Sequence, residues 1–145
     1  MFSPDFREFL RLLSDHHVEY MLVGGYAVGF YGYPRYTGDL DIWIKPSREN
    51  GEQLKSVLEK FGFGSLDVSP EDFTREYAVI QLGYPPLRID LVTTLDGVSF
   101  DECYARKQTH STEGVSADFI SLDDLKQNKR ATGRARDLDD LENLK

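Results

Sequence analysis

The sequence predicts an α/β (α+β) fold, a mixed β-sheet flanked by helices with further helices at the C-terminus. Three observations predict it. A short apolar strand run at residues 19–23 leads directly into a glycine turn and an apolar helical stretch. The run at residues 39–44 alternates with the two-residue period of a strand. Two further strand runs, 78–82 and 87–92, are separated by a Gly-Tyr-Pro-Pro turn and most simply form a hairpin.

Helices are expected around these strands. Ser3 followed by Pro4 is a cap and a first-turn proline for a helix that ends near residues 16–17. Residues 46–47 open a second helix, whose apolar side chains recur at helical spacing and cover the sheet. Ser121 caps a helix that runs toward Gly133, and residues 136–144 form the last helix. The order therefore alternates strands with helices along most of the chain.

Length and composition fit a small enzyme. The 145 residues are expected to form a single domain, 1–145, in which 121–145 is a C-terminal helical segment, and 40% hydrophobic residues suffice for one core. A single cysteine, Cys103, excludes an intrachain disulfide and a multi-cysteine zinc site. No apolar run approaches the roughly 20 residues that span a bilayer, and the N-terminus lacks a leader pattern. We therefore expect a cytoplasmic protein without a membrane partner.

Charge narrows the class of ligand. A net charge of -8 argues against a protein that coats nucleic acid with a uniformly basic surface. A small nucleotide neutralised by metal is easier to reconcile with this charge. The basic residues are nevertheless uneven, because five of them gather near the C-terminus: Lys126, Lys129, Arg130, Arg134 and Arg136. Local binding of phosphate, including one RNA end, therefore stays open.

Three aspartates carry the strongest chemical signal. Asp39 and Asp41 lie two residues apart in a strand, so both carboxylates leave the same face, while the apolar residues between them face a core. The same alternation puts Asp90 on the polar face of its own strand. If the two strands are neighbours, the three carboxylates meet and repel one another, which implies a hard divalent cation such as Mg²⁺.

A glycine turn precedes the aspartates. Gly24 and Gly25 stand between a strand and a helix, where glycine permits unusual backbone angles and a close approach of phosphate. Gly29 completes no G-x-G-x-x-G fingerprint, and no Walker lysine follows. The meaning of the turn therefore comes from the aspartates downstream.

In order and spacing, these residues resemble the nucleotidyltransferase superfamily, which includes DNA polymerase beta and the aminoglycoside nucleotidyltransferases. The pattern of that family is a glycine turn, an acidic-x-acidic strand and a third acidic residue on a later strand. The segment 35–41, Arg-Tyr-Thr-Gly-Asp-Leu-Asp, and the C-terminal run 125–141 are also similar to its small abortive-infection and toxin–antitoxin branch. The resemblance spans roughly residues 19–141.

The resemblance implies an enzyme that transfers a nucleoside monophosphate from a nucleoside triphosphate to a hydroxyl acceptor, with pyrophosphate leaving. The acceptor would be a protein, a tRNA or RNA end, or a small molecule. Two Mg²⁺ ions, or Mn²⁺ in their place, would be held by the acidic residues. The implied catalytic and metal-binding residues are Asp39, Asp41 and Asp90, and the implied nucleotide-binding residues are Gly24, Gly25, Arg35, Thr37 and Lys129.

For several residues, a purely structural role is an alternative to a role in the site. Arg35 would pair with a surface carboxylate, and Thr37 would cap a turn. Lys129 would join ion pairs on a helix surface at three- and four-residue spacings, together with Arg134, Asp137 and Asp140. Trp43 shares the alternating face of Asp39 and either lines a base pocket or packs in the core.

The function keeps alternatives as well. One is a toxin–antitoxin or phage-defence component with a cognate partner protein. Another is a non-catalytic nucleotide- or protein-binding module that retains the fold. A glycosyltransferase that uses Asp-x-Asp to hold a nucleotide sugar would normally need a longer chain. A homodimer that completes the cleft also stays open.

Overall fold

The computed structural model describes residues 1–33, 38–84 and 87–144. One mixed sheet, with strand order β3-β4-β2-β1-β6-β5, runs through the centre of the molecule. β2 lies parallel to β4 and antiparallel to β1, and β1 lies parallel to β6. The strands are β1 (Tyr20–Val23), β2 (Asp39–Ile44), β3 (Val79–Tyr84), β4 (Leu87–Val92), β5 (Gln108–Thr112) and β6 (Val115–Phe119). The predicted mixed sheet and the β3–β4 hairpin are confirmed.

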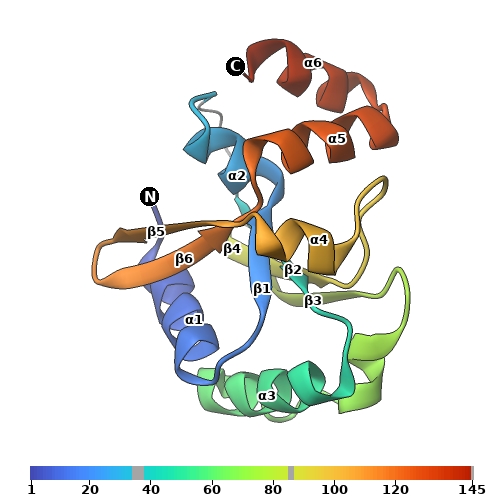
Figure 1. Ribbon diagram of the computed structural model, residues 1–145. Coiled ribbons are helices and arrows are strands. Elements are labelled where there is room, and N and C mark those ends of the chain that lie inside the picture. Colours follow the sequence, from blue (N-terminus) through green and yellow to red (C-terminus); the bar gives the residue numbers. More distant parts are fainter. Residues whose placement is uncertain (34–37, 85–86, 145) are drawn as a thin grey trace.

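Six α-helices surround this sheet in the described part of the chain (Figure 1). They are α1 (Pro4–Asp15), α2 (Gly24–Phe30), α3 (Arg48–Leu58), α4 (Phe100–Ala105), α5 (Leu122–Thr132) and α6 (Ala135–Asn143), with a π-helical turn at Glu59–Phe63 and a 3₁₀ helix at Pro70–Thr74. Serine hydroxyls cap three of the predicted starts: Ser3 accepts from the Phe6 amide, Ser47 from that of Asn50 and Ser121 from that of Asp124. Each bond satisfies an amide that has no partner within its own helix.

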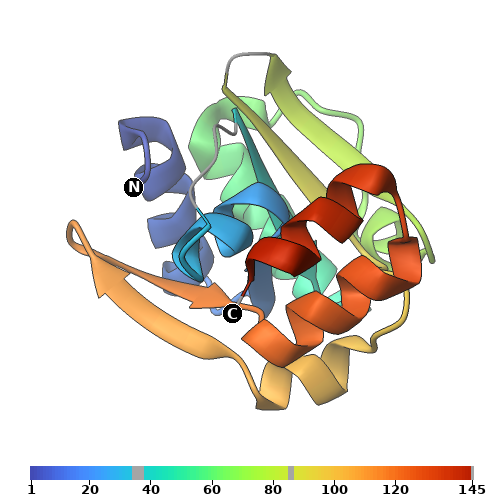
Figure 2. The same ribbon diagram turned by 90° about the horizontal axis from the view of Figure 1, so that it is seen from above.

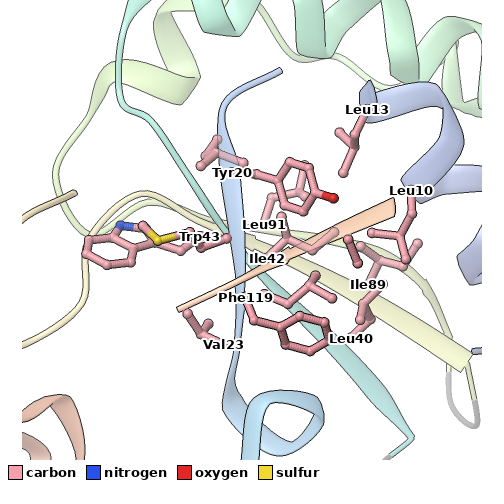
Figure 3. Close-up of a cluster of buried hydrophobic side chains, with 14 of the residues drawn as sticks. Leu10, Leu13, Tyr20, Val23, Leu40, Ile42, Trp43, Ile89, Leu91 and Phe119 are labelled. Carbon is pink, nitrogen blue, oxygen red and sulfur yellow. The ribbon is translucent and has the colours of Figure 1, made fainter. Parts of the chain in front are cut away.

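One face of the sheet builds the core. Leu40, Ile42 and Ile44 of β2 are completely buried, as their alternation predicts. Figure 3 shows Ile42 close to Leu10 and Leu13 of α1, which covers this face. The aspartates between these residues consequently leave the opposite face, and the core fixes which way they point.

The opposite face is apolar at one end of β2. Trp43 is buried, its indole Nε1 donates a 3.2 Å hydrogen bond to the Thr93 carbonyl, and its ring meets Phe100 of α4 edge to face. Trp43 therefore packs in the hydrophobic core (Figure 3). Of the two readings that the sequence leaves for Trp43, the structural one holds.

The strand patterns did not predict the β5–β6 hairpin or α4. β5 carries only polar side chains, so no apolar face marks it as a strand. The turn between the strands is Glu113-Gly114, and both residues have positive φ, at 53° and 80°. This is the backbone of a tight hairpin turn. β6 then pairs with β1 and leads the chain into α5.

The C-terminal helices are placed over the glycine turn. Gly133 follows α5 in the left-handed conformation, with φ of 64°, and lets the chain reverse into α6. Both views show α5 and α6 side by side above α2 (Figures 1 and 2). Residues far apart in sequence thus face the polar side of β2. No helix within the described ranges combines the length and apolar character needed to cross a membrane.

Candidate active site

The three predicted carboxylates lie on one face of two adjacent strands. In the parallel pairing of β2 with β4, Asp41 stands opposite Asp90, and Asp39 stands opposite Arg88. Side chains at paired positions of neighbouring strands project on the same side of the sheet. Asp39, Asp41 and Asp90 are thereby gathered in one polar row, as their spacing predicts.

Arg88 completes this row. Its guanidinium Nη2 lies 2.8 Å from Oδ2 of Asp39 and 3.1 Å from Oδ2 of Asp90. The hydrogen bond to Asp90 raises the pKa of Arg88 above its ordinary value, so the guanidinium stays charged. One fixed positive charge therefore offsets part of the repulsion within the cluster. The two-residue period that puts Asp90 on this face puts Arg88 there too, so the sequence contains the signal for it.

Asp41 has a carboxyl group with a raised pKa. Burial, followed by the charges of Asp90 and Asp39, raises its pKa to about 6, although Arg88 and Lys129 act in the opposite direction. Its carboxylate also lies directly against Gly24. A Cβ at position 24 would stand 2.2 Å from Oδ2 of Asp41, which no real side chain tolerates. The glycine turn therefore makes room for the aspartate strand.

The chemistry of the donor set fits Mg²⁺. Carboxylate oxygens are the ligands that Mg²⁺ prefers. Oδ1 of Asp90 is buried and forms no hydrogen bond within the described ranges, although Nε of Arg88 lies 3.0 Å away. Among the residues that the structure describes, no three acidic, histidine or cysteine groups converge closely enough to hold an ion. Arg88 lies between the carboxylates, and metal binding would require its guanidinium to shift.

A cleft of about 410 Å³ opens above this row. Its lining unites the glycine turn, the aspartates and Arg88 with side chains from the C-terminal helices. Those C-terminal residues are Lys129, Arg134, Arg136 and Asp137. The basic groups face the carboxylates across the cleft, and this is the arrangement that a metal-bound polyphosphate needs. The structure thus brings together Gly24, Gly25, Asp39, Asp41, Asp90 and Lys129 of the predicted site.

Lys129 is held in a buried ion-pair network. Its Nζ lies 3.0 Å from Asp137 and 3.1 Å from Asp140, and all three side chains are less than a tenth exposed. Asp137 also accepts hydrogen bonds from Thr132 and Arg134. The alternative of surface pairs at three- and four-residue spacings is therefore wrong for Lys129, whose partners are 8 and 11 residues away on α6. Among these residues, only Arg134 and Asp137 form an ion pair at the expected three-residue spacing.

Other predicted site residues have different outcomes. Arg35 and Thr37 lie outside the described residues, so their proposed phosphate contacts stay predictions. Of the five C-terminal basic residues, Lys126 and Arg130 are not among those that line the cleft. Arg136 lines it just after the reversal at Gly133, a position that only the fold of the C-terminal helices reveals.

Comparison with solved structures identifies the fold. A putative nucleotidyltransferase from Thermotoga maritima superposes with a TM-score of 0.66 at 16% identity, covering 99% of this chain and 94% of that one. An antigenic nucleotidyltransferase-like protein from Paracoccidioides brasiliensis superposes with a TM-score of 0.55 at 18% identity, covering 99% and 77%. No protein-family model matches the chain, and no curated protein matches it. The chain has the nucleotidyltransferase fold, as its motifs predict.

Proposed function

We propose that this protein is a metal-dependent nucleotidyltransferase, which transfers a nucleoside monophosphate from a nucleoside triphosphate to a hydroxyl acceptor. One observation carries the proposal. Asp39, Asp41 and Asp90 face a single cleft whose other walls are the Gly24-Gly25 turn and basic side chains from α5 and α6. The shared fold of two nucleotidyltransferase-named proteins supports it.

The acidic row would hold the metal. Asp39, Asp41 and Asp90 are its proposed ligands, and two bound Mg²⁺ or Mn²⁺ ions would neutralise the triphosphate and lower the pKa of the attacking hydroxyl. Asp90 lies beside Arg88 at one side of the row and would accept the proton of the acceptor hydroxyl. Asp41 lies against the glycine turn and would position the phosphate end of the nucleotide.

The basic wall would hold the triphosphate. Arg134 has a side chain that is 76% exposed, and it lines the cleft together with Arg136. Arg134 donates from Nε to Asp137, and the outer nitrogens of both guanidinium groups would contact phosphate oxygens, which guanidinium groups bind in bidentate fashion. Lys129, which lines the same cleft, would add a further positive charge close to the phosphates. Arg35 and Thr37 are proposed as further phosphate contacts.

The role of Lys129 is open to a direct test. Triphosphate affinity is measured by calorimetry for the wild type, Lys129→Ala and Arg130→Ala, whose side chain lies outside the cleft lining. Weaker binding in the first variant alone supports a phosphate contact. Unaltered affinity in a folded Lys129→Ala protein removes it.

The experiment on activity follows label from α-labelled triphosphates. Each triphosphate is incubated with Mg²⁺ and a cell extract, and label is followed on protein, RNA and small molecules. Wild type is compared with Asp39→Asn and with Asp101→Asn, a matched control whose side chain is 84% exposed on α4. Label that needs Asp39 but not Asp101 establishes the transferase and identifies the class of acceptor.

A non-catalytic nucleotide-binding module is the second candidate, and the position of Arg88 favours it. Its guanidinium is paired with Asp39 and Asp90, two of the proposed metal ligands. Calorimetry separates the two functions. If the protein binds triphosphate in the presence of Mg²⁺ but transfers no label in any extract, it is a binding module. Transfer of label would exclude that function.

The biological setting is proposed from the sequence resemblance to the abortive-infection and toxin–antitoxin branch. Expression of the wild type would then arrest growth or neutralise a toxic partner, and Asp39→Asn would do neither. Co-purification with the product of a neighbouring gene would identify a cognate partner, and sedimentation would distinguish a monomer from a homodimer.

A further inference from the structure

A second pocket, of about 270 Å³, adjoins the cleft. The two hollows share part of their lining, so the second opens directly from the place proposed for the phosphates. The shared residues are Gly24, Asp41, Lys129, Arg134 and Asp137. The residues that line only the second pocket differ in character. Val23, Val92 and Leu95 are apolar and Tyr77 is aromatic, and the polar ones are Thr94, Asp96, Asn128 and Thr132. Small-molecule sites combine such apolar walls with a few polar groups.

We infer that this pocket binds the base of the nucleoside triphosphate, with Tyr77 as its stacking surface and Asn128 as the group that contacts the polar edge of the base. The inference rests on the proposed function, which it deepens by assigning the nucleoside end of the substrate. A base is planar, apolar on its faces and polar at its edge, and the lining offers a partner for each of these features.

Close packing against α5 fixes one wall of the pocket. Gly97 adopts a φ of +80°, and a Cβ at this position would stand 2.5 Å from Cβ of Ala131. Only glycine therefore allows the turn after β4 to approach the helix so closely. Asn128 of α5 adds a 3.0 Å hydrogen bond to the Asp96 carbonyl of the same turn. The wall is thus formed before any ligand binds.

Tyr77 is held at the pocket in an unfavourable backbone conformation. Its φ is 56°, a region that bulky residues rarely adopt and that costs free energy, which other contacts must offset. Its amide donates a 2.9 Å hydrogen bond to Oγ1 of Thr94, and its hydroxyl lies 3.4 Å from Asp96. The side chain nevertheless remains 66% exposed. An exposed aromatic ring fixed beside a pocket is suited to stack on a base.

Asn128 has one amide atom left for a ligand. Its Nδ2 is committed to the Asp96 carbonyl, and this bond defines the orientation of the amide because only the nitrogen donates. Oδ1 accepts no hydrogen bond from the described part of the chain. Asn128 is buried and lines the pocket. A base with an exocyclic amino group, as in ATP or CTP, would supply the missing donor.

The nucleoside fits here better than the acceptor does. Asp90 and Arg88 line the cleft but not the second pocket, whereas Asp41 lines both. The group proposed to take the acceptor proton, Asp90, therefore faces the cleft and not the second pocket. A triphosphate lying over Asp41 would extend its base into the pocket and leave the Asp90 side open for the acceptor.

Calorimetry with two ligands tests the inference. Mg²⁺-ATP and Mg²⁺-tripolyphosphate share the phosphates, but only ATP has a base. Tyr77→Ala should weaken ATP binding about 5- to 100-fold, the range for loss of one stacked base, and leave tripolyphosphate binding unchanged. Leu95→Trp, which fills the pocket, should act likewise. Leu66→Trp, at an exposed position of 37%, is the matched control and should change neither affinity.

The outcomes separate the two proposals. If the wild type binds neither ligand, the proposed function fails and the base site falls with it. If the wild type binds both ligands but binds ATP no more tightly than tripolyphosphate, the base site alone is overturned. The same conclusion follows if Tyr77→Ala and Leu95→Trp bind ATP as tightly as the wild type does. Unchanged tripolyphosphate affinity also shows that each variant has folded with an intact cleft.

The contact from Asn128 has its own measurement. ATP should bind about 3- to 10-fold more tightly than inosine triphosphate, which lacks the amino group, as expected for one hydrogen bond. CTP should exceed UTP by a similar factor, and Asn128→Ala should remove both differences. Equal affinities within each pair for the wild type would overturn this role.

Discussion

Arg88 of β4 donates a 2.8 Å hydrogen bond from Nη2 to Oδ2 of Asp39, its register partner on β2. The same guanidinium contacts Asp90, two residues further along its own strand. Two of the three carboxylates thus share one internal cation. This offsets part of the repulsion within the row, and it makes Arg88 a competitor for any cation that binds there.

Arg88→Gln should strengthen the binding of Mg²⁺. Removal of the positive charge leaves the three carboxylates facing one another, so the protein should melt at a lower temperature without metal and bind Mg²⁺ about fivefold or more tightly. Calorimetric titration and thermal melts with and without Mg²⁺ measure both effects. Arg75→Gln is the control, because that side chain is 73% exposed and pairs only at 3.6 Å. An Mg²⁺ affinity equal to that of the wild type would show that Arg88 and the ion do not compete.

Asp39→Asn should abolish the binding of Mg²⁺-triphosphate and the transfer of label, while the free energy of unfolding changes by less than about 1 kcal/mol. The Asp39 side chain is 38% exposed, and its pairing with Arg88 is therefore screened by solvent. Chemical denaturation in metal-free buffer measures the stability. A large loss of stability there would contradict a role in binding and indicate a structural one.

Gly24→Ala should remove triphosphate binding through Asp41. The new Cβ would meet the Asp41 carboxylate and would also impose a positive φ on alanine, which costs about 1 to 2 kcal/mol. Gly29→Ala in the same helix is the matched control. Nothing lies within 4 Å of its Cβ position, and alanine should stabilise the helix by about 0.5 to 1 kcal/mol. Affinity and melting temperature of both variants are compared, and retained binding in folded Gly24→Ala would refute the tight fit.

The local patterns predicted the part of the fold that positions the aspartates. Alternation in β2 and β4 placed Asp39, Asp41 and Asp90 on one face, because a strand has only two faces and a core claims one of them. The hairpin of β5 and β6 was not predicted, because β5 has no apolar side chain and therefore no alternating pattern. Edge strands need no such pattern.

The C-terminal half of the cleft depends on tertiary contacts that no local pattern contains. Within a single helix, Lys129 would lie too far along the axis from Asp137 and Asp140 to contact them. The contacts form because the chain reverses at Gly133 and α6 packs against α5. The second pocket likewise depends on the packing of Gly97 against Ala131, two segments that only the folded chain brings together. The sequence shows the charged residues and the glycines, but it does not predict which residues they contact.

Asp137→Asn should destabilise the protein at neutral pH. The Asp137 carboxylate is 3% exposed and is bound by Lys129, Thr132 and Arg134, so loss of its charge should cost about 1 to 3 kcal/mol. Asp139→Asn, exposed on the same helix, should change the free energy of unfolding by less than about 0.5 kcal/mol. Urea denaturation at pH 7 compares the two variants, and equal stabilities would show that the network contributes nothing.

The difference between wild type and Asp137→Asn should shrink in acid. Burial raises the pKa of Asp137, but hydrogen bonds from Thr132, Arg134 and Lys129 outweigh it and hold the pKa well below its ordinary value. A carboxyl whose pKa is depressed by folding stabilises the protein fully above its unfolded pKa of about 4, and this stabilisation is lost as the pH falls below that value. Urea denaturation repeated from pH 7 down to pH 2 measures the trend. A difference in unfolding free energy that stays constant throughout would mean that Asp137 acts through its shape and not through its charge.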